Sequence, residues 1–123
     1  MKTEQSLAIR VLLLPKDTNA LGTIFGGVIL SHIDLAAAVE ARRHTSHPLV
    51  TVAMREVVFH RPVYLGDLVS FYTRLVRIGT TSITVHVDVR AERHGATEEV
   101  GVTDAEVVYV AVDEEGKKVP VHS

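Results

Sequence analysis

The segment from Asp17 to Thr45 constrains the possible folds of this chain more than any other stretch of the sequence. It begins with a polar loop and a glycine pair, Gly26-Gly27, and continues into a run with helical composition. From Phe25 to Ala41 almost every side chain in that run is apolar or small. A helix that is apolar nearly all round has to be covered by other structure. The rest of the chain is therefore predicted to wrap around this helix.

One acidic residue, Asp34, lies in the middle of the predicted helix. Its same-face neighbours, three and four residues away, are Leu30, Ser31, Ala37 and Ala38, so the helix supplies no basic partner. Burying a carboxylate without a partner costs free energy. Because that cost needs a reason, we expect Asp34 to have a chemical role.

Strand patterns account for most of the remaining sequence. Leu7–Leu14 predicts a first strand, and from Leu49 onward apolar residues recur with a period of two, in four long strands joined by tight turns. Short links between the last strands permit only antiparallel neighbours. We therefore predict an α+β fold of one domain over residues 1–123, with a curved antiparallel sheet of about five strands around one long central helix.

The strand that follows the helix carries apolar side chains on both faces. Val50, Val52 and Val58 are expected on one face, and Val57 and Phe59 on the other. The helix can cover only one of these faces, so burial of the other by a second copy of the chain is predicted.

Composition excludes several classes of function. The net charge of −2 gives nucleic-acid binding no electrostatic support, and the absence of cysteine excludes disulfides and thiol nucleophiles. No metal-ligand spacing is present, so no metal is expected. The N-terminus lacks a signal-peptide pattern, and no apolar run approaches the roughly 20 residues that span a bilayer. We therefore predict a soluble cytoplasmic protein without nucleic-acid or membrane partners.

The glycine pair at the start of the helix can bind an oxyanion. Gly26 and Gly27 place unshielded N–H groups at the positive end of the helix dipole, where a ligand oxygen can approach. Asp34 lies roughly 10–12 Å further along the axis, too far to reach the same carbonyl carbon. The two features are thus expected to meet across a dimer, with Asn19 in the preceding loop facing the partner's Asp34. Taken singly, each feature is also compatible with a purely structural role.

The order and spacing of several motifs resemble the hotdog-fold acyl-CoA thioesterases. The motifs are D-T-N-x-x-G-x-x-F-G-G-x(6)-D from Asp17 to Asp34, R-P-V-x-x-G-D from Arg61 to Asp67, and G-T-T-S from Gly79 to Ser82. The similarity extends from about Leu7 to Lys117. Within this family the chain particularly resembles the bacterial short acyl-CoA hydrolases of the YciA type and the related brain-type hydrolases. It implies a hydrolase of fatty acid metabolism that cleaves acyl-CoA to a carboxylic acid and coenzyme A.

The resemblance also implies roles for individual residues. Asp34 would act as general base on water or as nucleophile through a mixed anhydride. Asn19 of the opposing subunit would orient the thioester or the water, and a backbone N–H of Gly26 or Gly27 would bind the oxyanion. Thr51 is a further candidate for holding the water, with an ordinary strand position as the alternative.

Coenzyme A binding is assigned to two further regions. The segment Gly79, Thr80, Thr81 and Ser82 resembles a family loop near the coenzyme A phosphates or pantetheine, although a plain turn is the alternative. Arg61 is expected to face the ligand or an acidic residue of another subunit, such as Asp67 or Glu56. No cofactor is expected, because coenzyme A is part of the substrate and product.

Two rival functions and several assemblies remain open in the sequence. A hotdog hydratase or dehydratase would need a histidine paired with an acid, but His32 lies on a different helix face from Asp34 and Glu40 lies near the helix end. A non-catalytic acyl-CoA-binding or regulatory module is the second rival. A homodimer is the predicted minimal active unit. The family resemblance favours a hexamer built as a trimer of dimers, and a tetramer is also compatible.

Overall fold

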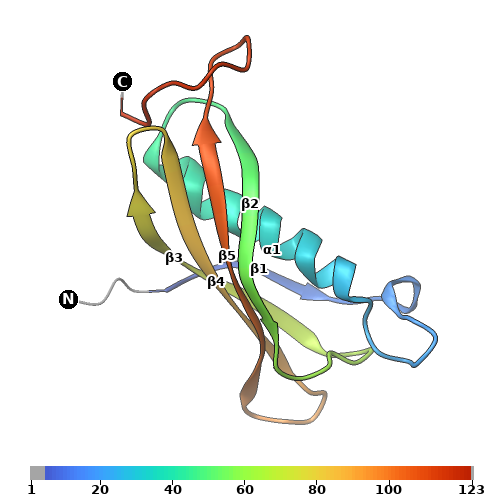
Figure 1. Cartoon of the computed structure of the whole chain (residues 1–123). Helices are drawn as coiled ribbons and strands as arrows, with labels where there is room; N and C mark the ends of the chain where they lie inside the picture. Colours follow the sequence, from blue (N-terminus) through green and yellow to red (C-terminus); the bar gives the residue numbers. More distant parts are fainter. Residues whose placement is uncertain (1–4, 123) are drawn as a thin grey trace.

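The apolar stretches form one long helix and five strands in the computed structural model, which describes residues 5–122 (Figure 1). The elements are β1 (Ser6–Leu12), α1 (Gly26–Ala41), β2 (Leu49–Phe59), β3 (Leu68–Ile78), β4 (Ser82–Glu92) and β5 (Glu99–Ala111), with the short 3-10 turns η1 (Pro15–Asp17) and η2 (Arg42–His44) on either side of α1. The predicted α+β fold is confirmed. Residues 1–4, which belong to the predicted domain and to the stretch without a signal-peptide pattern, lie outside the described residues, as does residue 123.

The first strand ends earlier than the apolar pattern predicts. It was expected to reach Leu14, but β1 ends at Leu12. The carboxylate of Asp17 accepts a hydrogen bond of 2.9 Å from the backbone N–H of Leu14, and Pro15 opens η1. This local turn therefore replaces the last two positions of the predicted strand.

The five strands form one antiparallel sheet in the order β1-β3-β4-β5-β2. The prediction of antiparallel neighbours for the last strands is confirmed for β3, β4 and β5. The prediction that tight turns join all four long strands is wrong between β2 and β3. These two strands are not neighbours, so segment 60–67 has to carry the chain across the sheet from the β2 edge.

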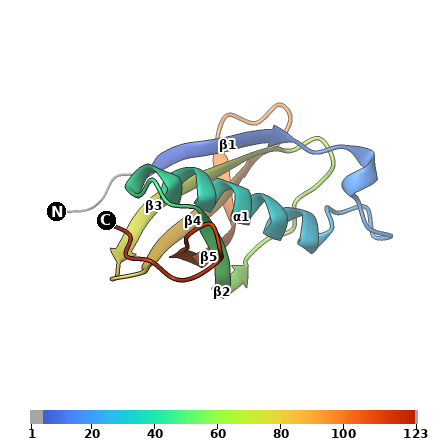
Figure 2. The same ribbon diagram turned by 90° about the horizontal axis from the view of Figure 1, so that it is seen from above.

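One face of α1 packs on the sheet and forms the core. Figure 2 shows α1 lying across the sheet, with the edge strands β1 and β2 on either side. The buried apolar residues of the helix are Ile29, Ile33, Ala36, Ala37 and Ala41. They share the core with fully buried side chains of the sheet: Val69, Phe71, Ile83, Val85, Val87 and Val89. The three alanines keep the helix close to the strands, since they add little volume between them.

The opposite face of α1 remains uncovered in the single chain. Leu35 is 59% exposed and Val39 is 43% exposed. The predicted sheet curls around α1 from one side, and the side that carries Leu35 and Val39 stays open in a single chain, because a sheet covers only one side of a helix. Edge strand β2 adds exposed apolar side chains, Val50, Val52 and Val58 among them. Within residues 5–122, no helix is both long and apolar enough to cross a membrane.

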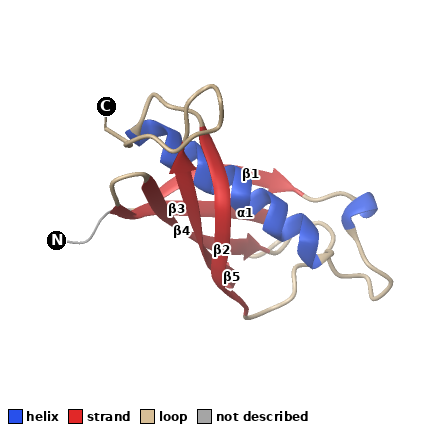
Figure 3. Cartoon of the chain, turned by 45° about the horizontal axis from the view of Figure 1, so that its top comes forward, coloured by secondary structure: helices blue, strands red, loops and turns tan. Residues whose placement is uncertain are grey.

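Loops gather at the two ends of α1. Figure 3 shows the segment that contains η1 at the N-terminal end of the helix and the C-terminal segment after β5 at the other end. The helix starts at Gly26, as predicted, with Phe25 in extended conformation before it. The N–H of Phe25 donates to the carbonyl of Asp17 at 2.8 Å, and the N–H of Ile24 donates to Val63 at 2.8 Å. These bonds fix the start of the helix against η1 and against segment 60–67.

Candidate active site

Asp34 is held by two hydroxyl groups from the sheet. Thr51 Oγ donates a hydrogen bond of 2.9 Å to Asp34 Oδ1, and the Tyr109 hydroxyl donates one of 2.8 Å to the same oxygen. Thr51 of β2 and Tyr109 of β5 are paired directly opposite each other in the strand register. Side chains paired in this way lie on the same face of the sheet. The β2–β5 register therefore places both donors beneath the middle of α1.

This environment corrects one expectation about Asp34. The carboxylate was predicted to be buried without a partner, but Asp34 is half-buried and both its donors come from strands. The helix itself contributes none, as the sequence indicates. Hydroxyl donors stabilise the charged form of a carboxylate without neutralising it. The two hydroxyls therefore compensate the partial burial of the Asp34 carboxylate.

The two carboxylate oxygens of Asp34 have different surroundings. Oδ1 accepts both hydrogen bonds, whereas Oδ2 has no hydrogen-bond donor among residues 5–122. Thr51 is exposed and Asp34 is half-buried, so water can reach this side of the helix in a single chain. One anchored oxygen and one open oxygen suit a carboxylate that takes a proton from water or attacks an electrophile.

Tyr109 is the partner that sequence reasoning missed. Its side chain is only 2% exposed, and its hydroxyl also lies 2.6 Å from the backbone carbonyl of Asp34. Burial raises the pKa of Tyr109 well above its ordinary range, and the hydrogen bond to Asp34 and the Asp34 charge raise it further. The phenol therefore stays protonated and remains a donor. One signal was present in the sequence: a tyrosine among the valines and alanines of a buried strand needs a partner for its hydroxyl.

The glycine pair begins the helix with two open amides. No acceptor among residues 5–122 binds the N–H of Gly26 or of Gly27. A Cβ atom added at Gly26 would lie 3.7 Å from the ring of Phe59, which is an ordinary van der Waals contact. The chain itself therefore does not require glycine at this position. The lack of a side chain leaves room for something that approaches from outside.

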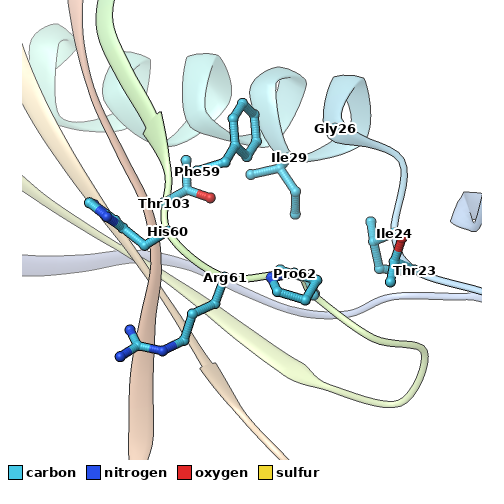
Figure 4. Close-up of a pocket in the computed structure, with 10 residues that line it drawn as sticks. Thr23, Ile24, Gly26, Ile29, Phe59, His60, Arg61, Pro62 and Thr103 are labelled. Carbon is cyan, nitrogen blue, oxygen red and sulfur yellow. The ribbon is translucent and has the colours of Figure 1, made fainter.

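A cavity of about 210 Å³ lies beside Gly26. Figure 4 shows the ring of Phe59 next to Ile29, with the guanidinium of Arg61 directed away from both. Thr103 also lines this cavity, and its buried hydroxyl oxygen has no hydrogen-bond partner within residues 5–122. Asp34, Thr51 and Tyr109 are not among the lining residues. Within one chain the glycines and Asp34 thus occupy separate places on α1.

Asn19 is engaged within its own loop. Its Oδ1 accepts hydrogen bonds from the N–H groups of Leu21 at 2.8 Å and Thr23 at 3.2 Å, and its Nδ2 donates to Thr23 Oγ at 2.9 Å. These bonds order the turn that precedes the helix. Asn19 and Asp34 are not in contact within one chain, so the role of Asn19 toward a partner's Asp34 stays a prediction.

Arg61 bonds to the backbone of its own chain, and its predicted contact with the ligand or with an acid of another subunit stays a prediction. Its Nη1 donates to the carbonyl of Gly101 at 2.8 Å. Asp67, one of the acids considered for it, is buried and forms an ion pair with Arg93 at 3.1 Å. The Arg61 side chain is exposed, so a ligand could still reach its guanidinium.

The segment Gly79–Ser82 forms the tight link between β3 and β4. The N–H of Gly79 donates to the carbonyl of Ser82 at 2.8 Å, and the carbonyls of Thr80 and Thr81 accept bonds from Val121 and Ala111. A Cβ at Gly79 would lie 2.7 Å from Ser82 Oγ. Local packing is therefore sufficient to explain this glycine, and coenzyme A binding here stays a prediction.

The histidine–acid pair of a hydratase is not assembled near Asp34. His32 Nδ1 lies 2.8 Å from the carbonyl of Val28, and its ring stacks on Phe71. Glu40 is buried and bonds to His44 at 2.7 Å and to Arg43 at 3.4 Å. Across the described part of the chain, no group of three or more acidic or histidine side chains is arranged to hold a metal ion.

Comparisons with known proteins agree with this architecture. Residues 21–98 match the family model described as the thioesterase superfamily. The acyl-CoA thioester hydrolase YciA of Salmonella typhimurium is 41% identical over 94% of this chain and 89% of its own length. The corresponding YciA protein of Escherichia coli is 42% identical over 90% of this chain and 86% of its own length.

Solved structures give the same result. A hexameric hotdog fold thioesterase of Campylobacter jejuni superposes with a TM-score of 0.87 at 45% identity, over 94% of this chain and 89% of that chain. A hexameric thioesterase from Yersinia pestis superposes with a TM-score of 0.91 at 35% identity, over 98% of both chains. The chain therefore belongs to the thioesterase superfamily and has the hotdog fold. The family, the fold and the classification as an enzyme, all predicted from the sequence, are confirmed.

The protonation state of Tyr109 can be measured directly. The protein contains three tyrosines, and raising the pH to about 11 ionises an ordinary phenol. Because its pKa is raised far above that range, Tyr109 is expected to add nothing to the phenolate absorbance of the folded protein. Wild type and Tyr109→Phe should thus give the same absorbance change, with circular dichroism confirming that both stay folded. A smaller change in the variant would contradict the assignment.

Proposed function

We propose that this chain is an acyl-CoA thioester hydrolase in which Asp34 acts as general base or nucleophile. The observation that carries the proposal is the asymmetric carboxylate of Asp34, with Oδ1 held by Thr51 and Tyr109 and Oδ2 open. It occurs in a chain whose relatives are named acyl-CoA thioester hydrolases.

The proposed reaction needs only one carboxylate and a few oriented donors. Water, deprotonated by Asp34, attacks the thioester carbonyl carbon; alternatively the carboxylate attacks first and water then hydrolyses the mixed anhydride. The carbon–sulfur bond breaks, coenzyme A leaves as the thiolate, and that thiolate takes up the proton. Thiolates leave readily, so little acid assistance is required. Coenzyme A enters and leaves as part of substrate and product, and no further cofactor takes part.

Two subunits are proposed to build each site. Gly26 and Asp34 are separated by eight residues, about 12 Å along the axis of one helix. A second copy with its α1 antiparallel would bring the open amides of Gly26 and Gly27 near the middle of the first helix. The amides would then stabilise the oxyanion that forms on the thioester carbonyl. The exposed apolar side chains of Leu35, Val39 and β2 support such a contact, because a second copy would cover them.

Further proposals on assembly and on coenzyme A binding follow from the same arrangement. Asn19 would face the partner's Asp34 together with the glycines. Thr23 of the same chain, which is hydrogen-bonded to Asn19, lines the cavity beside Gly26. Arg61, exposed at that cavity, and the link Gly79–Ser82 are proposed to contact coenzyme A. A hexamer built from three dimers is proposed over a tetramer, because solved relatives are described as hexameric. A cytoplasmic location stays a prediction from the sequence.

The central role of Asp34 is tested by coenzyme A release from acyl-CoAs of increasing chain length. In Asp34→Asn the side chain keeps its shape but loses its charge and basicity. We expect turnover to fall at least about a hundredfold, the effect of losing one acid–base group. Asp113→Asn is the matched control, since the Asp113 carboxylate accepts bonds from the backbone N–H groups of Glu115 and Lys117 in the turn after β5, and it should retain wild-type activity.

Two results would contradict this proposal. Asp34→Asn with wild-type turnover would make Asp34 structural. A wild-type protein that binds coenzyme A but releases no thiol from any acyl-CoA would favour the non-catalytic binding module instead.

The proposed approach of substrate to the helix start predicts a steric effect at Gly26. In Gly26→Ala the added Cβ meets only an ordinary contact with Phe59, so the free energy of unfolding should stay equal or rise by up to about 1 kcal/mol. Thioester turnover should fall at least about tenfold, because the methyl group displaces the carbonyl from the amides. Denaturant unfolding and steady-state kinetics measure the two effects.

Gly101→Ala provides the control for the Gly26 variant. Gly101 lies in β5, and a Cβ there meets nothing within 4 Å. Its turnover should equal that of wild type. Full activity in Gly26→Ala would exclude close approach of the substrate to these amides.

A further inference from the structure

We infer that Tyr109 is a positioning residue that orients Asp34 for the reaction through its hydroxyl group. This inference rests on the proposed function, since it assigns Tyr109 a role in thioester hydrolysis by Asp34. None of the sequence motifs described above assigns Tyr109 a role. Its basis is the set of contacts that joins the last strand to the middle of the helix.

The Tyr109 hydroxyl contacts two parts of the same residue. It lies 2.6 Å from the backbone carbonyl of Asp34 and 2.8 Å from Asp34 Oδ1. A single group that bridges the main chain and the carboxylate limits rotation of the side chain between them. Thr51 Oγ reaches the same Oδ1 at 2.9 Å from the neighbouring strand. Together the two hydroxyls select one orientation of the carboxylate, in which Oδ2 is the oxygen left open.

The position of Tyr109 is fixed by strand pairing on both sides of β5. It lies in β5 between two neighbours, with Ile83 of β4 opposite it on one side and Thr51 of β2 on the other. Its side chain is buried in the core, while its hydroxyl reaches the half-buried carboxylate. A fixed aromatic ring on a central strand positions a hydroxyl more reproducibly than a loop residue would. The raised pKa of Tyr109 keeps the hydroxyl protonated, so it remains a hydrogen-bond donor.

The catalytic consequence concerns orientation rather than substrate binding. Rates of reactions at a positioned group fall steeply when the group moves by about 1 Å from its productive place. Without the phenol, Asp34 would keep its bond to Thr51 but would sample other rotamers. We therefore expect Tyr109→Phe to lower kcat at least about tenfold and to change KM by less than about threefold, the pattern of an interaction needed mainly in the transition state.

Tyr72→Phe is the matched control. The Tyr72 hydroxyl also donates to a carboxylate, Glu99, at 2.8 and 3.1 Å, but on β3 and away from Asp34. The same atom is removed and the same type of bond is lost in both variants. Tyr72→Phe should keep the wild-type kcat, and unfolding measurements on both variants allow rates to be compared at equal concentrations of folded protein.

The double variant separates positioning from a general structural effect. If Tyr109 acts through Asp34, adding Tyr109→Phe to Asp34→Asn should cause no further loss of kcat, because the group to be oriented is already inactive. The inference is overturned if Tyr109→Phe keeps the wild-type kcat, or if its kcat is lowered no more than that of Tyr72→Phe. It is equally overturned if the losses multiply in the double variant, since Tyr109 would then act independently of Asp34.

Failure of this inference differs from failure of the proposed function. If Asp34→Asn retains activity, the proposed function is wrong, whatever Tyr109→Phe does. If Asp34→Asn is inactive and Tyr109→Phe is fully active, only the role of Tyr109 is lost.

Discussion

A carboxylate in the middle of a largely apolar helix is the constraint on which the rest of the site depends. Asp34 lacks a basic partner on α1, so its stabilisation has to come from the sheet below. Thr51 and Tyr109 supply it, and they can do so only because they are paired opposite each other in β2 and β5. A slip of β2 by one residue along β5 would turn the Thr51 hydroxyl to the other face of the sheet, away from Tyr109. The core packing that fixes the register thus also maintains the site.

Uncovered surfaces of the single chain point to the same region. Leu35 and Val39 are exposed on the helix face turned away from the sheet, and β2 is an edge strand with several exposed valines. Gly26 leaves space that its own chain does not fill. Asp34, Thr51 and the glycines of α1 therefore all border surface that is open in one subunit. A second copy would bury the apolar groups and complete the proposed site in a single contact.

The sequence predicts the local structure well because local chemistry determines it. Alternating valines define β4, and the change from polar loop to glycine pair locates the start of α1 at Gly26. The spacing from Asp17 to Asp34 is sufficient to indicate the family. Thr51 was a candidate by resemblance, and the structure brings it to Asp34.

Contacts that depend on the pairing of distant strands could not be predicted from the sequence. Tyr109 is 75 residues from Asp34 in the chain, and their contact depends on which strand lies beside β2. The link between β2 and β3 resembles a turn in sequence, yet it crosses the sheet, because strand order depends on tertiary packing. Asn19 illustrates a different difficulty: the residue type that could orient a substrate is also one that orders a turn through its own backbone.

The most direct test of a site shared between subunits is the activity of mixed oligomers. Chains with Asp34→Asn and chains with Gly26→Ala, each with reduced activity alone, would be produced together so that hybrid dimers form. A shared site restores one complete pair of Gly26 and Asp34 in every hybrid, so random pairing should recover about a quarter of the wild-type sites. Mass spectrometry of the intact oligomers would verify that hybrids are present. If verified hybrids are no more active than the two parent variants, the site does not combine residues of two subunits and the account is wrong.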